Sequence, residues 1–175
     1  MTAELLSDGT KRICLSRNQF EKIGEALRAF YQKSKCGAIL LADSSGMLIA
    51  HSGTLDASAK ALLATLAAGN YAATNEMARL VGEEAGFKVH FLEGAKNSVY
   101  VTGVDDNYFL VVVFGQTTTF GMVRLMTAKV AEQVLAGLNL PAEGEVVEIV
   151  KREVESEEFR DELSSRLDAV LFQRS

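Results

Sequence analysis

The hydrophobic pattern of the chain changes several times between helical and strand-like spacing. Ser16 and Gln19 have the spacing of a helix-capping box. The apolar residues that follow share one helix face, namely Phe20, Ile23, Leu27, Phe30 and Tyr31. We therefore predict a helix from Ser16 to about Lys35. Residues 38–42 and 47–51 then form two short apolar runs around a turn sequence, which predicts a β-hairpin.

A second, longer helix and three more strands follow. Asp56 is a suitable N-cap for a helix that continues to about Glu84 and ends before Gly86. Strands are expected over residues 88–92, 97–104 and 108–114, with the turn residues Asp105, Asp106 and Asn107 between the last two. A third helix should begin at 117–119 and end near 138. Its expected apolar stripe consists of Met122, Leu125, Met126, Val130, Val134 and Leu138.

The element order α-β-β-α-β-β-β-α predicts an α/β fold of the layered α+β type. Five strands would form one antiparallel sheet with helices on both faces. We expect an N-terminal extension (1–15), a main domain (16–138), an acidic linker (139–155) and a C-terminal amphipathic helix (156–175). Residues 11–15 fit either an added edge strand or a disordered segment, and the alternation at 146–150 fits either a strand or a helix.

The long helix that begins at Asp56 has two apolar faces. At 100° per residue, one face carries larger side chains and is expected to lie on the sheet; it consists of Leu62, Leu66, Gly69, Ala73, Met77 and Leu80. The other face carries small or polar residues and is expected to bind a partner; it consists of Ala61, Ala64, Thr65, Ala68, Ala72, Asn75, Glu76 and Arg79. Small side chains allow a second backbone to approach closely and lose little entropy on contact. The alternatives are burial inside a larger monomer and a surface that is rich in alanine for helix propensity.

The net charge of −5 is concentrated at the C-terminal end. Residues 1–138 carry 13 acidic and 13 basic side chains, whereas residues 139–175 carry 10 acidic and 5 basic ones. This balance argues against nucleic acid and against anionic membrane surfaces as partners. The N-terminus lacks the apolar core of a secretory signal. Cys14 and Cys36 do not form a CxxC pair, so we expect reduced thiols and a cytoplasmic protein.

The usual signatures of catalysis are absent from the sequence. The chain has no P-loop and no Gly-x-Ser-x-Gly elbow. His51 and His90 lie in strand-like runs, and a Cys36–His51 dyad would have no orienting residue. The carboxylates do not have metal-ligand spacing. We expect no cofactor, no metal site and no active site of the chain's own. Glu93 and Lys96 flank a turn, where they can pair with each other or contact a partner.

Four segments, in order, resemble the roadblock (dynein light-chain) superfamily and, within it, the MglB-like regulators. They are LAAGNYAA at 66–73, EGAKNSVYVT at 93–102, LVVVF at 110–114 and TFGMVRL at 119–125. The resemblance covers about residues 16–138. The segment LDAVLF at 167–172 is similar to the hydrophobic end of that family's tail.

This resemblance implies a homodimer whose sheets join edge to edge and whose two central helices lie side by side. It also implies a Ras-like small GTPase of the MglA type as partner, activation of GTP hydrolysis, and a role in cell polarity or gliding motility. The tail helix, with Leu167, Leu171 and Phe172, would contact the GTPase. Activation would come from a conformational shift in the GTPase, with Arg79 as a rim contact rather than an arginine finger.

Two other functions remain open from the sequence. Roadblock proteins also serve as scaffolds that do not accelerate hydrolysis. A profilin-like or PAS-like sheet can form a small-molecule sensor, although the apolar strands and the alanine-rich helix leave little polar lining for a ligand cavity.

Overall fold

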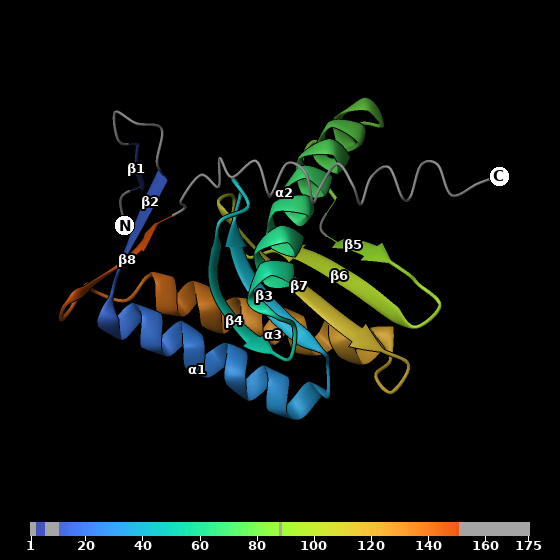
Figure 1. The fold of residues 1–175 in the computed structure, drawn as a ribbon. Helices are drawn as coiled ribbons and strands as arrows, with labels where there is room; N and C mark the ends of the chain where they lie inside the picture. Colours follow the sequence, from blue (N-terminus) through green and yellow to red (C-terminus); the bar gives the residue numbers. More distant parts are fainter. Residues whose placement is uncertain (1–2, 6–10, 88, 151–175) are drawn as a thin grey trace.

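The computed structural model describes residues 3–5, 11–87 and 89–150. Its main body has the predicted order of helices and strands (Figure 1). The elements are β1 (Ala3–Leu5), β2 (Lys11–Ser16), α1 (Arg17–Ser34), β3 (Ala38–Asp43), β4 (Leu48–Gly53), α2 (Ala57–Leu80), β5 (Val89–Leu92), β6 (Asn97–Gly103), β7 (Tyr108–Gly115), α3 (Phe120–Leu138) and β8 (Val146–Val150).

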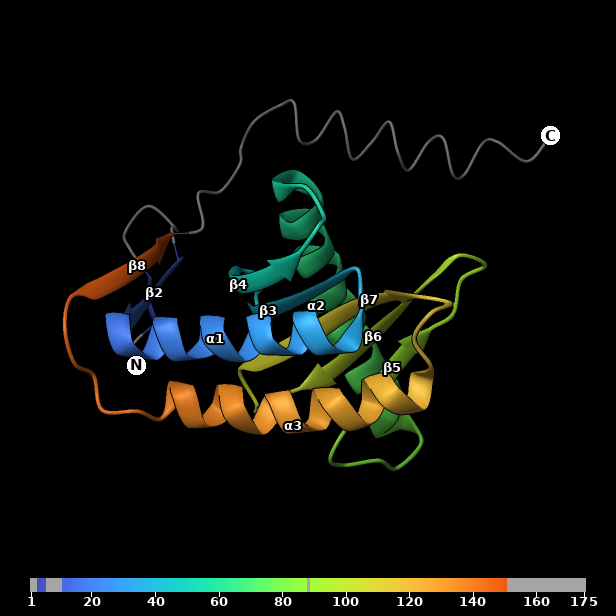
Figure 2. The ribbon, with the colours of Figure 1, turned by 90° about the horizontal axis from the view of Figure 1, so that it is seen from below.

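The central sheet has five strands in the order β4-β3-β7-β6-β5, and all neighbours are antiparallel. The predicted fold class is therefore confirmed. Helices α1 and α3 lie side by side on one face of the sheet, and α2 crosses the opposite face (Figure 2). Strand β3 is buried along its whole length because it lies inside the sheet and is covered on both faces. The sheet thus separates two hydrophobic clusters.

The helix starts follow the capping signals in the sequence. The backbone N–H of Ser16 donates to Gln19 Oε1 at 3.0 Å, and the Gln19 amide donates to the carbonyls of Leu138 and Leu140. One glutamine therefore caps α1 and ties it to the end of α3. Asp56 caps α2 by accepting from the backbone N–H of Ala59 at 2.7 Å.

Helix α2 ends earlier than the sequence suggested. It stops at Leu80 rather than near Glu84, because Gly82 rather than Gly86 provides the terminating left-handed residue, with φ of 83°. The backbone N–H of Glu83 then donates to the carbonyl of Ala78 at 2.8 Å, which closes the helix end.

The predicted stripe of α3 is partly wrong. Val130, Val134 and Leu138 are buried as expected, but Met122 and Leu125 are 52% and 72% exposed. Val123 and Thr127 are the buried residues in the first turns of α3 instead.

A second, three-stranded sheet forms from segments that are far apart in the chain, in the order β1-β2-β8. Residues 11–16 are thus a strand, although not one at the edge of the central sheet, and the ambiguous segment 146–150 is also a strand. Ile13 and Leu15 of β2 belong to the hydrophobic cluster on the side of the central sheet that α1 and α3 cover. Arg17 and Glu145 pair at 2.8 Å where β2 and β8 meet the helices. The predicted domain boundaries remain predictions, and the expected helix at 156–175, with Leu167, Leu171 and Phe172, lies outside the described residues.

Candidate partner-binding face on helix α2

Small side chains bring the first half of α2 very close to the sheet. Ala64 is fully buried, and Ala67 and Ala68 are nearly so, against Leu40 and Ala42 of β3. At the β3–β4 turn, a Cβ on Gly46 would lie 2.7 Å from the Cα of Thr65. Gly46 also has φ of 80°, so the turn requires glycine for both reasons. The close contact fixes which side of α2 faces the sheet.

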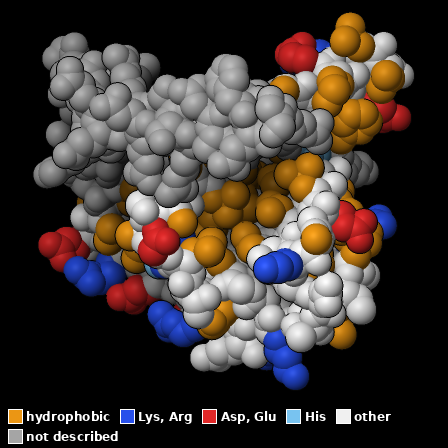
Figure 3. Space-filling view, turned by 45° about the vertical axis from the view of Figure 1, so that its right-hand side comes forward, with side chains coloured by type: hydrophobic (Ala, Val, Ile, Leu, Met, Phe, Trp, Pro, Cys, Tyr) orange, Lys and Arg blue, Asp and Glu red, His pale blue; other side chains and the backbone are white. Residues whose placement is uncertain are grey.

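The observed rotation of α2 overturns the predicted assignment of its faces. Five of the six residues that were expected on the sheet face away from it, and Leu66, Met77 and Leu80 are 55%, 51% and 87% exposed. The sixth, Leu62, is half-buried. We call Leu66, Gly69, Ala73, Met77 and Leu80 the α2 stripe. Its members are all exposed. Figure 3 shows hydrophobic side chains gathered where α2 protrudes from the body, at the upper right.

The predicted partner-binding set is divided by the same rotation. Ala64 and Ala68 are buried under α2, so the prediction that they lie on a free face is wrong. The physical reason is that alanine is the residue that allows this helix to approach the sheet, and these two alanines make that contact. Ala61, Thr65, Ala72, Glu76 and Arg79 are exposed, and Asn75 is half-buried. We call these six residues the α2 flank; their role in binding a partner stays a prediction.

The second half of α2 is anchored to strand β5 by a polar contact that the sequence did not reveal. The hydroxyl of Thr74 lies 3.0 Å from Nδ1 of His90, and the ring of Tyr71 stacks on the His90 ring at 4.9 Å between centroids. The oxygen of the Asn70 side chain lies 3.4 Å from the same Nδ1. His90 is buried, and this burial lowers its pKa because it disfavours the charged ring. The available signal was the i, i+4 spacing of Asn70 and Thr74.

Strand β5 is the last strand of the central sheet, and no described strand pairs with its outer edge. Leu92, on this strand, is 51% exposed. An exposed edge and a neighbouring exposed apolar stripe are both features that proteins normally cover. The α2 stripe and the β5 edge therefore form one candidate interface.

The described residues offer little catalytic chemistry. Burial raises the pKa of the Cys36 thiol, which disfavours a nucleophilic thiolate. The pKa of His51 is lowered by burial and by the charge of Lys60. No group of three or more metal-ligating side chains occurs within 3–5, 11–87 and 89–150. Helices α1, α2 and α3 each lack the apolar length needed to cross a bilayer.

A five-stranded antiparallel sheet with two helices on one face and one exposed helix on the other is the fold of a known protein family. The sequence profile of the Roadblock/LC7 domain matches residues 22–114. The chain therefore belongs to the Roadblock/LC7 family. No curated protein sequence matches significantly.

Solved structures narrow the similarity to MglB. Myxococcus xanthus MglB is 35% identical, with a TM-score of 0.63; the alignment covers 67% of this chain and 94% of that one. The gliding protein MglB of Thermus thermophilus is 31% identical, with a TM-score of 0.66 and coverage of 71% and 93%. A structure described as MglB with a tetrameric arrangement gives the same values. The chain is thus an MglB-like member of the roadblock superfamily.

Proposed function

We propose that this protein is a homodimeric, GTPase-activating regulator of a Ras-like small GTPase of the MglA type. The observation that carries the proposal is the exposed α2 stripe beside the free edge of β5. The similarity to MglB supports the same function, and the roadblock fold is typically non-catalytic. We propose that the protein acts in the cytoplasm on cell polarity or gliding motility.

A second copy of the chain fits the stripe and the edge together. Pairing two β5 edges antiparallel would satisfy the backbone groups that one copy leaves open. The same twofold axis would bring two α2 stripes into contact and remove Leu66, Met77 and Leu80 from water. That one MglB structure has a tetrameric arrangement supports self-association in this class.

The α2 flank lies on the other exposed side of the helix and would remain free in such a dimer. Ala61, Thr65 and Ala72 present little bulk, so a partner's backbone can come close. Arg79 forms an ion pair with Glu76 on the same helix. A paired, surface arginine is better suited to a rim contact than to insertion into a nucleotide site. We therefore propose that activation comes from binding one conformation of the GTPase.

Two substitutions test the two halves of this proposal. Leu66→Glu should convert the dimer to a monomer in light-scattering measurements, because it places a charge in the apolar contact. Leu125→Glu is the matched control, since it changes an exposed leucine on another helix. A monomeric wild-type chain, or dimers with Leu66→Glu, would contradict the dimer.

Ala72→Arg should leave the dimer intact and abolish binding to a purified MglA-type GTPase. The wild-type protein should accelerate phosphate release by that GTPase in a single-turnover assay. Binding without acceleration would show a scaffold instead of an activator, and unchanged binding by Ala72→Arg would exclude the α2 flank.

A further inference from the structure

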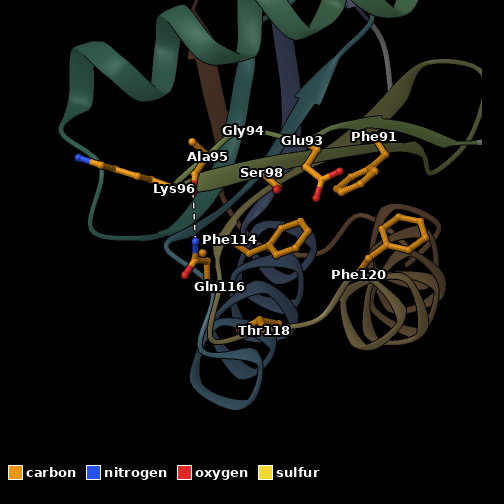
Figure 4. A pocket seen from close by; sticks show the side chains of 11 residues that line it. Phe91, Glu93, Gly94, Ala95, Lys96, Ser98, Phe114, Gln116, Thr118 and Phe120 are labelled. Atoms are coloured by element: carbon orange, nitrogen blue, oxygen red, sulfur yellow. Dashed lines mark hydrogen bonds between the residues drawn. The ribbon is translucent and has the colours of Figure 1, made fainter.

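A cleft lies on the opposite side of the sheet from α2, between the β5–β6 turn and the start of α3 (Figure 4). Its volume is about 380 Å³. Phe91, Phe114 and Phe120 supply aromatic surface, while Glu93, Ser98 and Gln116 supply polar groups. Adjacent residues of a strand face opposite sides of the sheet, so Phe91 faces this cleft whereas its neighbour His90 faces α2.

The aromatic rings form one continuous surface. Phe91 and Phe120 are in contact, with 4.6 Å between ring centroids, and Phe91 stacks on Phe114 at 6.2 Å. Phe91 and Phe120 are each 37% exposed. Ring faces that remain accessible can attract a cation through the negative potential of their π-systems.

The charged side chains at the cleft determine which sign of charge a ligand can carry. The carboxylate of Glu93 points toward the aromatic rings, whereas the side chain of Lys96 extends away from them (Figure 4). None of the described residues forms an ion pair or hydrogen bond with the Glu93 carboxylate. A negative group beside exposed rings repels anions and favours a cation with an apolar stem.

The walls of the cleft are held in place by hydrogen bonds. Gln116 Nε2 donates to the carbonyl of Ala95 at 3.1 Å, which joins the β7–α3 loop to the β5–β6 turn. The buried hydroxyl of Thr118 donates to the carbonyl of Ser34 at 2.9 Å, which ties the same loop to the end of α1. A site that is already formed costs little ordering entropy when a ligand binds.

We propose that this cleft binds an arginine side chain of a partner protein. The guanidinium would stack on the ring faces of Phe91 and Phe120 and pair with the Glu93 carboxylate. Arginine fits better than lysine because its planar group stacks on aromatic faces and can pair with a carboxylate through two parallel hydrogen bonds. Because the cleft and the α2 flank lie on opposite sides of the sheet, this partner is distinct from the proposed GTPase.

The test is an NMR titration of the full-length protein with N-acetylarginine methylamide. The amide signals of Gly94 and Lys96 should shift, with a dissociation constant of about 1 mM for so small a probe. The neutral citrulline analogue and the lysine analogue should each bind at least fivefold more weakly. Equal responses to the arginine and citrulline probes, or no response to arginine, would overturn the proposal.

Two glutamate variants distinguish binding in the cleft from general attraction of a cation to the protein surface. Glu93→Gln should weaken binding of the arginine probe at least fivefold. Glu132→Gln, which changes an exposed glutamate on α3, should leave this binding unchanged. An equal loss of affinity for the probe in both variants would contradict a specific site.

The same amide signals also show whether the chain itself fills the cleft. If the Gly94 and Lys96 signals of Leu66→Glu, which should lack the proposed β5-edge dimer, move on dilution without probe, a second copy occupies the cleft. If they move when the four arginines of 151–175 become glutamine, the chain's own segment does. Either result would overturn the proposed partner, and signals that stay in place in both experiments would support it.

Discussion

The two sides of the central sheet are built from different side chains. On the side of α1 and α3, the buried cluster consists mainly of Leu, Ile, Val and aromatic residues from two helices and the sheet. On the side of α2, one helix contributes the buried Ala64, Ala67 and Ala68, while its Leu66, Met77 and Leu80 point outward. The first side has the composition of a complete core. The second has that of a helix which completes its burial only when something else binds.

This difference predicts where a truncated leucine destabilises the fold most. Leu27→Ala, in the fully buried core of α1, should lower the free energy of unfolding by about 2–5 kcal/mol. Leu66→Ala removes the same atoms from an exposed site and should change it by less than about 0.5 kcal/mol in the monomer. Urea unfolding at low protein concentration measures both. Equal losses would show that the α2 stripe is part of the monomer's own core.

The close contact between α2 and the sheet predicts a smaller loss of stability, this time from an enlarged side chain instead of a truncated one. Ala64→Leu adds bulk where Ala64 is fully buried, so overpacking should destabilise the fold by about 1–3 kcal/mol. Ala72→Leu makes the same change at an exposed position of the same helix and should be nearly neutral. Thermal unfolding of the two variants side by side gives the answer. Two neutral variants would mean that α2 can move away from the sheet at little cost.

The sequence predicted the fold because strong local signals agreed with it. The capping residues Ser16 and Asp56 began α1 and α2 as predicted, and the β-branched run at 108–114 became the central strand β7. The pairing of β2 with β8 joins segments more than 120 residues apart, so no local pattern indicates it. The segment 146–150 was ambiguous because its final conformation depends on that distant strand.

The candidate site was harder to predict because α2 is apolar over much of its circumference. Leu66 and Met77 were assigned to the sheet by their size, yet the sheet required the smaller Ala64 and Ala68 for close approach. Size therefore indicated the wrong face. The position of His90 in a strand-like run was predicted, but its contact with Thr74 depends on how α2 crosses the sheet.

The contact between α2 and β5 predicts the smallest of these three effects, a loss of stability on mild acidification. The groups that face His90 are Asn70, Tyr71 and Thr74 of α2 and Val101 of β6, none of them charged at neutral pH. Burial places the folded-state pKa of His90 below its unfolded value of 6.5. As the pH falls from neutral through 6.5, the unfolded state therefore binds more protons at His90 than the folded state does. The free energy of unfolding decreases as a result. His90→Gln should reduce this dependence between pH 7.5 and 5.5 in urea unfolding, while His51→Gln should leave the contribution of His90 in place. If His90→Gln kept the full wild-type dependence on pH, this contact would not be the pH-sensitive link between helix and strand.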